Sequence, residues 1–375
     1  MTRGRVAGRA SGRAGTLARV NVFDRIAADG YEQVVFCHDR ASGLRAIVAI
    51  HSTVLGPSLG GTRFYPYSSE DAALEDVLRL AKGMTYKAAV SGLDLGGGKA
   101  VILGDPAVDK SEALLRAYAR FVHSLGGRYI TAEDIGTTQA DMDLIRRETT
   151  HVTGVSVELG GSGDPSAATA YGVLWAMKAV ARRLWNETDL GGRHVVVSGV
   201  GKVGTLLVRH LVEEQARVTV ADVAPAAVER VVLEHGVEAV PVESAHALAC
   251  DIFSPCAMGG VLDPVRIPEL GCTAVVGSAN NQLADPSCAK LLADQGVLYA
   301  PDYVVNAGGI INIAEELSPA GYHPDRALAA VRRIFDTTTA VLETAQGEGI
   351  TTAEAADRQA ERRVDAIGRV HQIRA

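Results

Sequence analysis

The sequence has little of what marks several large protein classes. Its five cysteines include no C-x-x-C pair, so the 375 residues offer neither a disulfide framework nor the ligand spacing of a zinc site. It has no run of about 18 apolar residues, the pattern that predicts a membrane span. The formal net charge is -7, whereas general nucleic-acid binding needs a clustered basic excess. We therefore expect a cytoplasmic protein that binds no metal, no nucleic acid and no membrane.

What the sequence does contain favours a large α/β protein. Apolar residues make up 47% of the chain, too many for a mostly disordered protein, and 40 glycines indicate many close backbone approaches. The length exceeds what one compact core usually holds, so two domains are expected. Residues 1–20 differ from the rest because they carry five arginines and no acidic residue. We expect them to form a disordered leader, with a transit peptide as the alternative.

Hydrophobic periodicity divides the remaining chain into two domains with a cleft between them. We assign residues 21–153 and 330–375 to a first α/β domain and residues 154–329 to a second one. Glycine and proline cluster at residues 160–165, which predicts the hinge. Beyond it, apolar strands alternate with helices to about residue 312, a pattern typical of a parallel, doubly wound sheet. In the first domain the predicted strands are residues 32–37, 44–50, 99–103 and 129–132.

A glycine motif in the second domain predicts a dinucleotide site. An apolar strand at residues 194–198 leads directly into G-x-G-x-x-G, a helical segment follows, and Asp222 ends the next strand. In such a motif the glycines permit a tight turn, backbone approach to the pyrophosphate at the helix N-terminus, and close packing of helix on sheet. Asp222 can bind the adenosine ribose and repels a 2′-phosphate, which favours NAD over NADP. The alternative is an ordinary strand–helix turn without a nucleotide. The motif residues are Gly199, Val200, Gly201, Lys202, Val203 and Gly204.

Two lysines stand in glycine-rich segments of the first domain. Lys87 ends the run Gly-Met-Thr-Tyr-Lys and Lys99 ends Gly-Gly-Gly-Lys. A lysine among apolar and glycyl residues is costly unless it is paired or exposed, and most lysines are exposed. The spacing of these two residues alone therefore leaves open whether they are functional or lie on the surface.

These segments together resemble those of the glutamate/leucine/phenylalanine/valine dehydrogenase family, above all its leucine and valine members. The resemblance covers about residues 31–336. It rests on Leu-Gly-Gly-Thr-Arg at 59–63, the two lysine motifs, Thr-Ala-Glu-Asp at 131–134, and Tyr-Ala-Pro-Asp-Tyr-Val-Val-Asn-Ala-Gly-Gly at 299–309. It implies the reversible, NAD(P)-dependent oxidative deamination of an L-amino acid to a 2-oxo acid and ammonia. It also implies that residues 21–153 and 330–375 form a substrate-binding and oligomerisation domain through which a homo-oligomer is built. Residues 154–329 would form the Rossmann NAD-binding domain, with the cleft between the two.

The resemblance implies a role for each site residue. Lys87 would hold the substrate carboxylate, Lys99 would be the catalytic lysine, and Asp134 would be its acid/base partner. Burial and the neighbouring ammonium of Lys87 would favour the neutral form of Lys99, which could then activate water. The other implied positions are the backbones of Gly60 and Gly61 near the substrate, and Asn281 and Thr169 near the nicotinamide.

The same resemblance implies which residues surround the substrate side chain. Glutamate-specific relatives carry a lysine and a serine at the positions of Leu59 and Ile313, so this chain should reject glutamate, whose carboxylate would be buried without a partner. An apolar pocket with two isoleucines suits valine, leucine or isoleucine, with valine marginally first. Alternatives are a phenylalanine dehydrogenase and a non-catalytic NAD-binding regulator. The implied pocket residues are Leu59, Ala132, Ile310 and Ile313.

Overall fold

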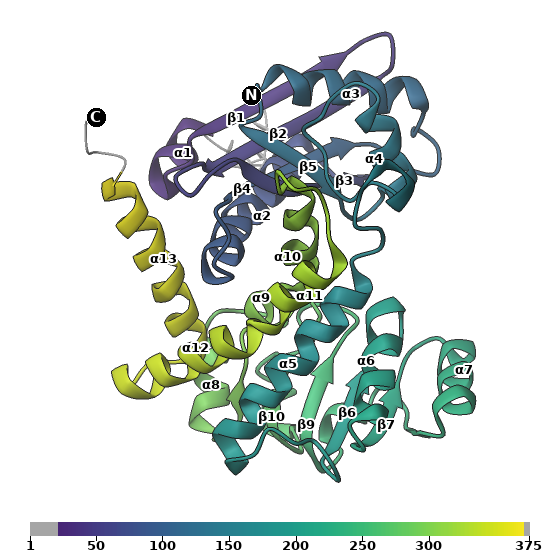
Figure 1. Ribbon diagram of the computed structural model, residues 1–375, viewed down its shortest axis with the longest axis vertical. Helices are drawn as coiled ribbons and strands as arrows, with labels where there is room; N and C mark the ends of the chain where they lie inside the picture. The colour runs from purple at the N-terminus through teal and green to yellow at the C-terminus, as the bar shows by residue number, and fades with distance from the viewer. Residues whose placement is uncertain (1–21, 371–375) are drawn as a thin grey trace, which may run out of the picture.

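Two sheets, each covered by helices, make up the described part of the chain. The computed structural model describes residues 22–370, so the leader expected at residues 1–20 lies outside the described residues. Figure 1 shows the first sheet with its helices at one end of the molecule and the second sheet at the other, with further helices between them. The expected α/β architecture with two sheets is confirmed.

The first sheet is mixed and has five strands. Its half of the chain contains α1 Val22–Asp29, β1 Gln33–Asp39, β2 Leu44–Ser52, β3 Ser58–Tyr65, α2 Glu70–Val90, β4 Gly96–Leu103, α3 Glu112–Ser124, β5 Tyr129–Glu133 and α4 Gln139–Arg146. The strand order is β1-β2-β4-β3-β5, and β3 runs parallel to both β4 and β5. Ile47 and Ala49 of β2 pack with α2, whereas Ala46 and Val48 pack with α3 and α4 on the other face.

β3 is a strand that the sequence did not predict, because glycine disfavours strand formation in residues 56–63. In the structure a Cβ at Gly60 would lie 1.8 Å from the carbonyl oxygen of Gly98 on β4. A Cβ at Gly61 would lie 2.3 Å from the carbonyl oxygen of Glu133 on β5. The central strands therefore approach so closely that these positions have no room for a side chain.

The second sheet has the strand order of a Rossmann fold. Its half contains α5 Ser166–Trp185, β6 His194–Ser198, α6 Lys202–Glu213, β7 Arg217–Ala221, α7 Pro225–His235, β8 Glu238–Ala239, β9 Cys250–Pro255, β10 Cys272–Val275, α8 Cys288–Asp294 and β11 Leu298–Tyr299. All of its strand pairs are parallel, in the order β11-β10-β9-β6-β7-β8. The chain order of these strands is therefore 3-2-1-4-5-6 when counted from the β8 edge, which confirms the doubly wound sheet.

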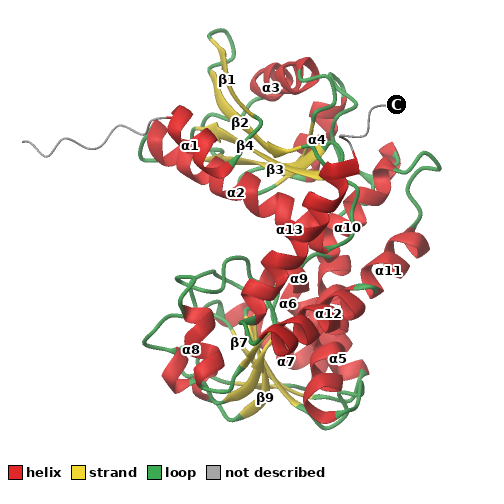
Figure 2. Cartoon of the chain, turned by 90° about the vertical axis from the view of Figure 1, so that its left-hand side faces the viewer, coloured by secondary structure: helices red, strands yellow, loops and turns green. Residues whose placement is uncertain are grey.

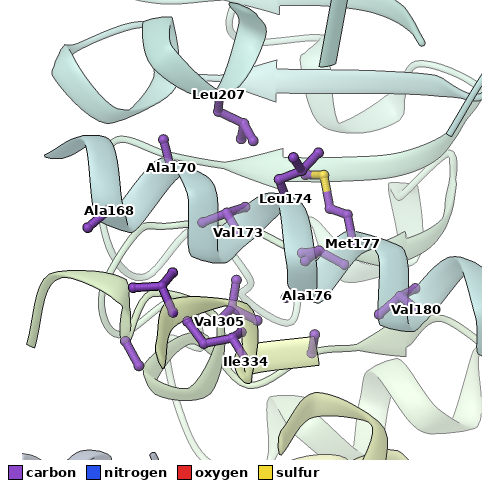
Figure 3. Close-up of a cluster of buried hydrophobic side chains, with 14 of the residues drawn as sticks. Ala168, Ala170, Val173, Leu174, Ala176, Met177, Val180, Leu207, Val305 and Ile334 are labelled. Atoms are coloured by element: carbon purple, nitrogen blue, oxygen red, sulfur yellow. The ribbon is translucent and has the colours of Figure 1, made fainter. Parts of the chain in front are cut away.

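α5 is the central helix of the second half. Its small and aliphatic residues, among them Val173 and Met177, are fully buried in one apolar cluster that also contains Leu207 of α6. Figure 3 shows Val305 and Ile334 on the opposite side of α5 from Leu207. Because α5 directly follows the predicted hinge, this packing fixes where the chain enters the second domain.

The two halves are joined by several segments of the C-terminal third. These are α9 Asp302–Val305, α10 Gly308–Ala314, α11 Pro324–Arg332, α12 Ile334–Glu348 and α13 Thr352–Val370. The sequence analysis assigned residues 330–375 to the first domain. Within them, α12 packs on α5 of the second half, whereas α13 crosses to pack on α2 of the first half. Figure 2 shows α13 running from the lower half to the upper half. Among residues 22–370, no helix has the length and apolar character needed to cross a membrane.

Glu316 ties the predicted hinge to the returning chain. Its carboxylate accepts hydrogen bonds from the backbone N–H of Gly154 at 3.0 Å and of Ser162 at 2.9 Å, and from the Ser162 hydroxyl at 2.5 Å. Burial raises the pKa of Glu316, although these donors oppose the rise. One side chain thus links the predicted hinge segment to the chain that follows α10.

Two helical glycines test how tightly the crossing of α5 and α10 is packed. A Cβ at Gly308 would lie 2.1 Å from the carbonyl oxygen of Ala168, whereas a Cβ at Gly347 in α12 would meet nothing within 4 Å. We expect Gly308→Ala to destabilise the protein by about 1–3 kcal/mol because backbone atoms must shift. Gly347→Ala should be neutral or stabilising by up to about 1 kcal/mol. Thermal melting of the two variants checks this, and equal melting temperatures would contradict the tight crossing.

Candidate active site

A buried ion pair joins the middle of β4 to the end of β5. Lys99 on β4 is only 5% exposed, and its Nζ lies 3.0 Å from Oδ1 of Asp134. Asp134 directly follows β5, and the turn that contains it is held by Thr137, whose Oγ1 accepts a hydrogen bond from the Asp134 N–H at 2.9 Å. The Thr137 hydroxyl also contacts the carbonyl oxygen of Thr62 on β3 at 2.8 Å. Three neighbouring strands thus fix the position of this pair.

Asp134 has a second cationic partner. Nε of Arg63 on β3 donates to Oδ2 of Asp134 at 2.8 Å. Burial by itself would raise the pKa of Asp134, but the charges of Lys99 and Arg63 and their hydrogen bonds outweigh it and lower the pKa to about 2. The carboxyl group of Asp134 is therefore ionised throughout the neutral range.

Lys87 on α2 faces the same group of charges. It is largely buried and makes no ion pair within 4.0 Å among residues 22–370. Burial and, to a smaller extent, the ammonium of Lys99 lower its pKa to about 8, against the opposing charges of Asp302 and Asp134. This lowered pKa distinguishes Lys87 from an ordinary surface lysine.

The backbone of β3 lies beside this charged cluster. The Gly60 carbonyl oxygen accepts a hydrogen bond from the Tyr129 hydroxyl at 2.6 Å, so this acceptor is already engaged. A Cβ at Gly61 would lie 2.9 Å from Cβ of Asp134. The absence of a side chain at Gly61 therefore lets Asp134 lie against the strand.

The residues expected around the substrate side chain come from both halves. Leu59 of β3 and Ile310 of α10 are buried in one apolar cluster, and Ile313 packs against its margin. Ala132 of β5 is 4% exposed and pairs with Gly61 in the parallel register of β3 and β5. The structure thus places Leu59 and Ile310 in one extended apolar cluster with Ile313 at its margin, and sets Ala132 two residues before Asp134.

A cavity of about 650 Å³ lies at the glycine motif of the second domain. Four of the residues expected to bind the dinucleotide line it: Val200, Gly201, Lys202 and Asp222. The remaining motif glycines lie behind the lining, where a Cβ at Gly204 would meet the Gly199 carbonyl oxygen at 1.9 Å. Val203 packs into the core.

The lining of this cavity is suited to a dinucleotide. A Cβ at Gly201 would meet no protein atom within 4 Å, so the backbone at the start of α6 is open to a ligand. Asp222 accepts hydrogen bonds from the backbone N–H of Val200 at 2.7 Å and of Ala224 at 2.9 Å, and so it joins the glycine turn to the end of β7. Each carboxylate oxygen keeps a further lone pair for a ribose hydroxyl. A bound dinucleotide would therefore meet open backbone N–H groups at one part of the cavity and an acceptor at another.

The two residues expected near the nicotinamide do not line this cavity. Thr169 on α5 donates its hydroxyl to the Pro165 carbonyl oxygen at 3.0 Å, and its Oγ1 would lie 3.0 Å from a Cβ at Gly309. Asn281 is exposed and has a positive φ of 52°. Thr169 thus lies against α10, the helix that carries two of the expected pocket residues.

One residue of this region was not predicted as a site residue. Asn306 is 5% exposed, and its amide nitrogen donates to the Ser278 carbonyl oxygen at 3.0 Å and to Oδ1 of Asn280 at 2.8 Å. Its Oδ1 is buried without a hydrogen-bond partner in the described chain. Asn306 lies in the 299–309 motif, but nothing in the sequence distinguishes a buried asparagine with a free acceptor from a capping residue. The unpartnered acceptor marks it as a candidate ligand-binding group.

Together, the Rossmann sheet and the buried lysine–aspartate pair define a dinucleotide-dependent dehydrogenase. Family comparisons agree: residues 31–151 match the Glu/Leu/Phe/Val dehydrogenase dimerisation domain, and residues 160–231 and 223–367 match the Glutamate/Leucine/Phenylalanine/Valine dehydrogenase domain. The chain belongs to this family and is an amino acid dehydrogenase.

Individual relatives cover nearly the whole chain. It is 51% identical to leucine dehydrogenase of Geobacillus stearothermophilus over 93% of this chain and 94% of that protein. It is 55% identical to valine dehydrogenase of Streptomyces virginiae over 89% of this chain and 94% of that protein. Among solved structures, L-tryptophan dehydrogenase from Nostoc punctiforme is 43% identical with a TM-score of 0.82, covering 93% of this chain and 100% of that one.

The lowered pKa of Lys87 predicts unusual reactivity. With a pKa of about 8, about half of its side chain is neutral at pH 8, against less than about 1% for an ordinary lysine. The rate of carbamylation by cyanate should therefore level off above about pH 9 at Lys87. It should still be rising at Lys202, whose hydrogen bond with Asp164 raises its pKa. Peptide mass spectrometry measures both rates, and parallel pH profiles for the two lysines would refute the assignment.

Proposed function

We propose that the protein catalyses the reversible, NAD-dependent oxidative deamination of a branched-chain L-amino acid to its 2-oxo acid and ammonia. The observation that carries this proposal is the ion pair of Lys99 and Asp134, buried beside Lys87. Leucine and valine dehydrogenases with about half of their residues identical support the substrate class. A regulator without catalysis would have no use for three buried charges that are costly to desolvate.

Lys87 holds the substrate carboxylate in this proposal. A largely buried ammonium without an ion-pair partner is suited to an anionic group, because the charges then compensate each other away from water. A bound nicotinamide coenzyme supplies the acceptor for the hydride that leaves the substrate Cα. The substrate ammonium group first releases a proton to water, and its nitrogen lone pair then forms the double bond as the hydride leaves, so the oxidised product is an iminium ion that keeps its nitrogen.

Lys99 and Asp134 act in the next step, in which a water molecule attacks the iminium ion. In its neutral form Lys99 accepts a proton from water, and the hydroxide oxygen bonds to the iminium carbon to give a carbinolamine. The carbon–nitrogen bond then breaks, the nitrogen leaves as ammonia after gaining a proton, and the hydroxyl becomes the oxo group as it loses one. Asp134 stabilises the positive charge on Lys99 and on the departing nitrogen.

The side-chain pocket selects the substrate. Leu59, Ile310 and Ile313 offer apolar contacts and no hydrogen-bond partner for a second carboxylate, so glutamate would bury an unpaired charge. Discrimination among aliphatic side chains is smaller, because one methylene contributes only about 1–3 kcal/mol. We propose valine, leucine and isoleucine as substrates, with valine marginally preferred.

Asp222 favours NAD as the coenzyme. Its carboxylate lines the cavity at the end of β7, where a ribose 2′-hydroxyl could donate a hydrogen bond and a 2′-phosphate would be repelled. Residues 31–151 match a dimerisation domain, and we propose that the enzyme is a homo-oligomer assembled through this part of the chain.

A substrate panel with a lysine variant tests the proposed reaction. With NAD at alkaline pH, reduced coenzyme should form with valine, leucine and isoleucine, more slowly with phenylalanine, and not with glutamate. Lys99→Ala should lower kcat by at least about 10³-fold while NAD binding persists. Lys82→Ala removes only a surface pair with Asp29 and is the matched control. NAD binding without turnover of any amino acid by the unmodified protein would instead favour a regulator.

Neutralising Asp222 tests the coenzyme preference. Asp222→Asn keeps an acceptor oxygen for the backbone but removes the charge that repels a 2′-phosphate. The ratio of kcat/KM for NAD to that for NADP should therefore fall by roughly 10- to 100-fold. Asp285→Asn, at an exposed acid of the same domain, should leave the ratio unchanged. An unchanged ratio in Asp222→Asn would show that another group sets the preference.

A further inference from the structure

Arg63 connects the catalytic carboxylate to a second buried acid. Its Nε donates to Oδ2 of Asp134, and its Nη1 donates to Oδ2 of Asp76 on α2, each at 2.8 Å. The Arg63 side chain is only 18% exposed. One guanidinium group thus bridges two carboxylates, an arrangement that its planar fork of donors permits and that a lysine cannot reproduce.

Asp76 is itself held from two further sides. The Tyr67 hydroxyl donates to its Oδ2 at 2.6 Å, and Nη2 of Arg79 donates to its Oδ1 at 2.8 Å. These hydrogen bonds and charges lower the pKa of Asp76, although burial opposes them. Arg63 is therefore anchored at a point remote from Lys99.

We propose that Arg63, anchored by Asp76, is a positioning residue that turns Oδ1 of Asp134 towards Lys99 and keeps this carboxylate ionised through the reaction. This inference rests on the proposed catalytic role of Lys99 and Asp134. Oδ2 of Asp134 is occupied by Arg63, which leaves Oδ1 for the lysine. Arg63 itself would not touch the substrate.

The need for such a residue follows from the reaction. Lys99 must be neutral when it accepts a proton from water, and at that moment it no longer compensates the charge of Asp134. A buried carboxylate without a cation would take up a proton. Arginine keeps its charge at any pH at which the enzyme works, so Arg63 still holds Asp134 ionised.

Other charges near Asp134 do not replace Arg63. Lys87 interacts with Asp134, but its own pKa is about 8 and it is proposed to bind the substrate carboxylate. Glu133 is the neighbouring acid. The charge of Asp134 contributes to raising the pKa of Glu133, so these two carboxylates repel each other and Glu133 cannot keep Asp134 ionised. Among the groups of residues 22–370 that face Asp134, only Arg63 is a cation with no other proposed part in the reaction.

The test compares pH profiles of kcat/KM for L-valine in Arg63→Gln and Arg63→Lys. Arg63→Gln removes a positive charge beside the Lys99–Asp134 pair, so the pair should hold its proton to a higher pH, and the acid limb should be displaced upward by about 1–3 units. Its kcat at the optimum should fall about 10- to 100-fold because Oδ1 is no longer held in place. Arg63→Lys keeps the charge, so its acid limb should move by less than about 1 unit while kcat still falls.

Arg120→Gln is the matched control, because Arg120 is an exposed arginine of the same half of the chain that pairs with Glu148 and is no part of this network. Its profile should coincide with that of the unmodified enzyme. If Arg63→Gln fails to fold, Asp76→Asn decides through kcat, because it removes the anchor of Arg63 but leaves its charge: a fall in kcat supports the proposal, and an unchanged kcat overturns it. A folded Arg63→Gln with an unchanged acid limb and kcat also overturns it.

Lys99→Ala in the same assay separates this inference from the proposed function. If Lys99→Ala is inactive while Arg63→Gln behaves like the unmodified enzyme, the reaction stands and the role of Arg63 falls. If Lys99→Ala keeps full activity, the proposed function falls, and with it the basis for a role of Arg63.

Discussion

The ion pair between Lys99 and Asp134 is the constraint on which the rest of the first domain depends. Removing two charges from water costs several kcal/mol each, and their mutual attraction compensates only when geometry and further hydrogen bonds are favourable. Here Arg63 and Thr137 supply those further bonds. They come from β3 and from the turn after β5, and β3 can approach so closely only because Gly60 and Gly61 lack side chains. The ion pair of the site therefore depends on the close strand packing that the glycines permit.

The charged site and the dinucleotide cavity belong to different sheets, so their relative position must be maintained by other contacts. α13 makes several of them. The hydroxyl groups of Tyr86 and Tyr303 donate to Glu361 at 2.9 Å and to Asp357 at 2.6 Å, and both tyrosines are sequence neighbours of charged residues at the site. Arg363 binds the Leu93 carbonyl oxygen at 2.6 Å, just beyond α2. α13 therefore braces the helix that carries Lys87 against the second half.

The sequence predicts the second domain better than the first for a physical reason. Valine-rich strands and the G-x-G-x-x-G turn are local signals, and each is read within a few residues. β3 has no such signal, since its glycines serve contacts with strands distant in sequence. The resemblance to a family identified Lys87, Lys99 and Asp134 as candidate site residues. The residues that lie beside them are instead determined by the order of the strands in the sheet. The second bond of Arg63 and the unpartnered oxygen of Asn306 therefore emerge only from the fold.

The two lysines show how one functional group acquires two properties from its surroundings. Lys99 has a carboxylate at 3.0 Å, whereas Lys87 has no ion-pair partner among residues 22–370, and burial lowers its pKa to about 8. A substrate carboxylate would supply the missing counter-charge, so it would bind the protonated form of Lys87 better than the neutral form. By linkage, binding must then raise this pKa, and above about pH 8 substrate and proton are taken up together. The lysine that binds the substrate therefore also couples binding to pH.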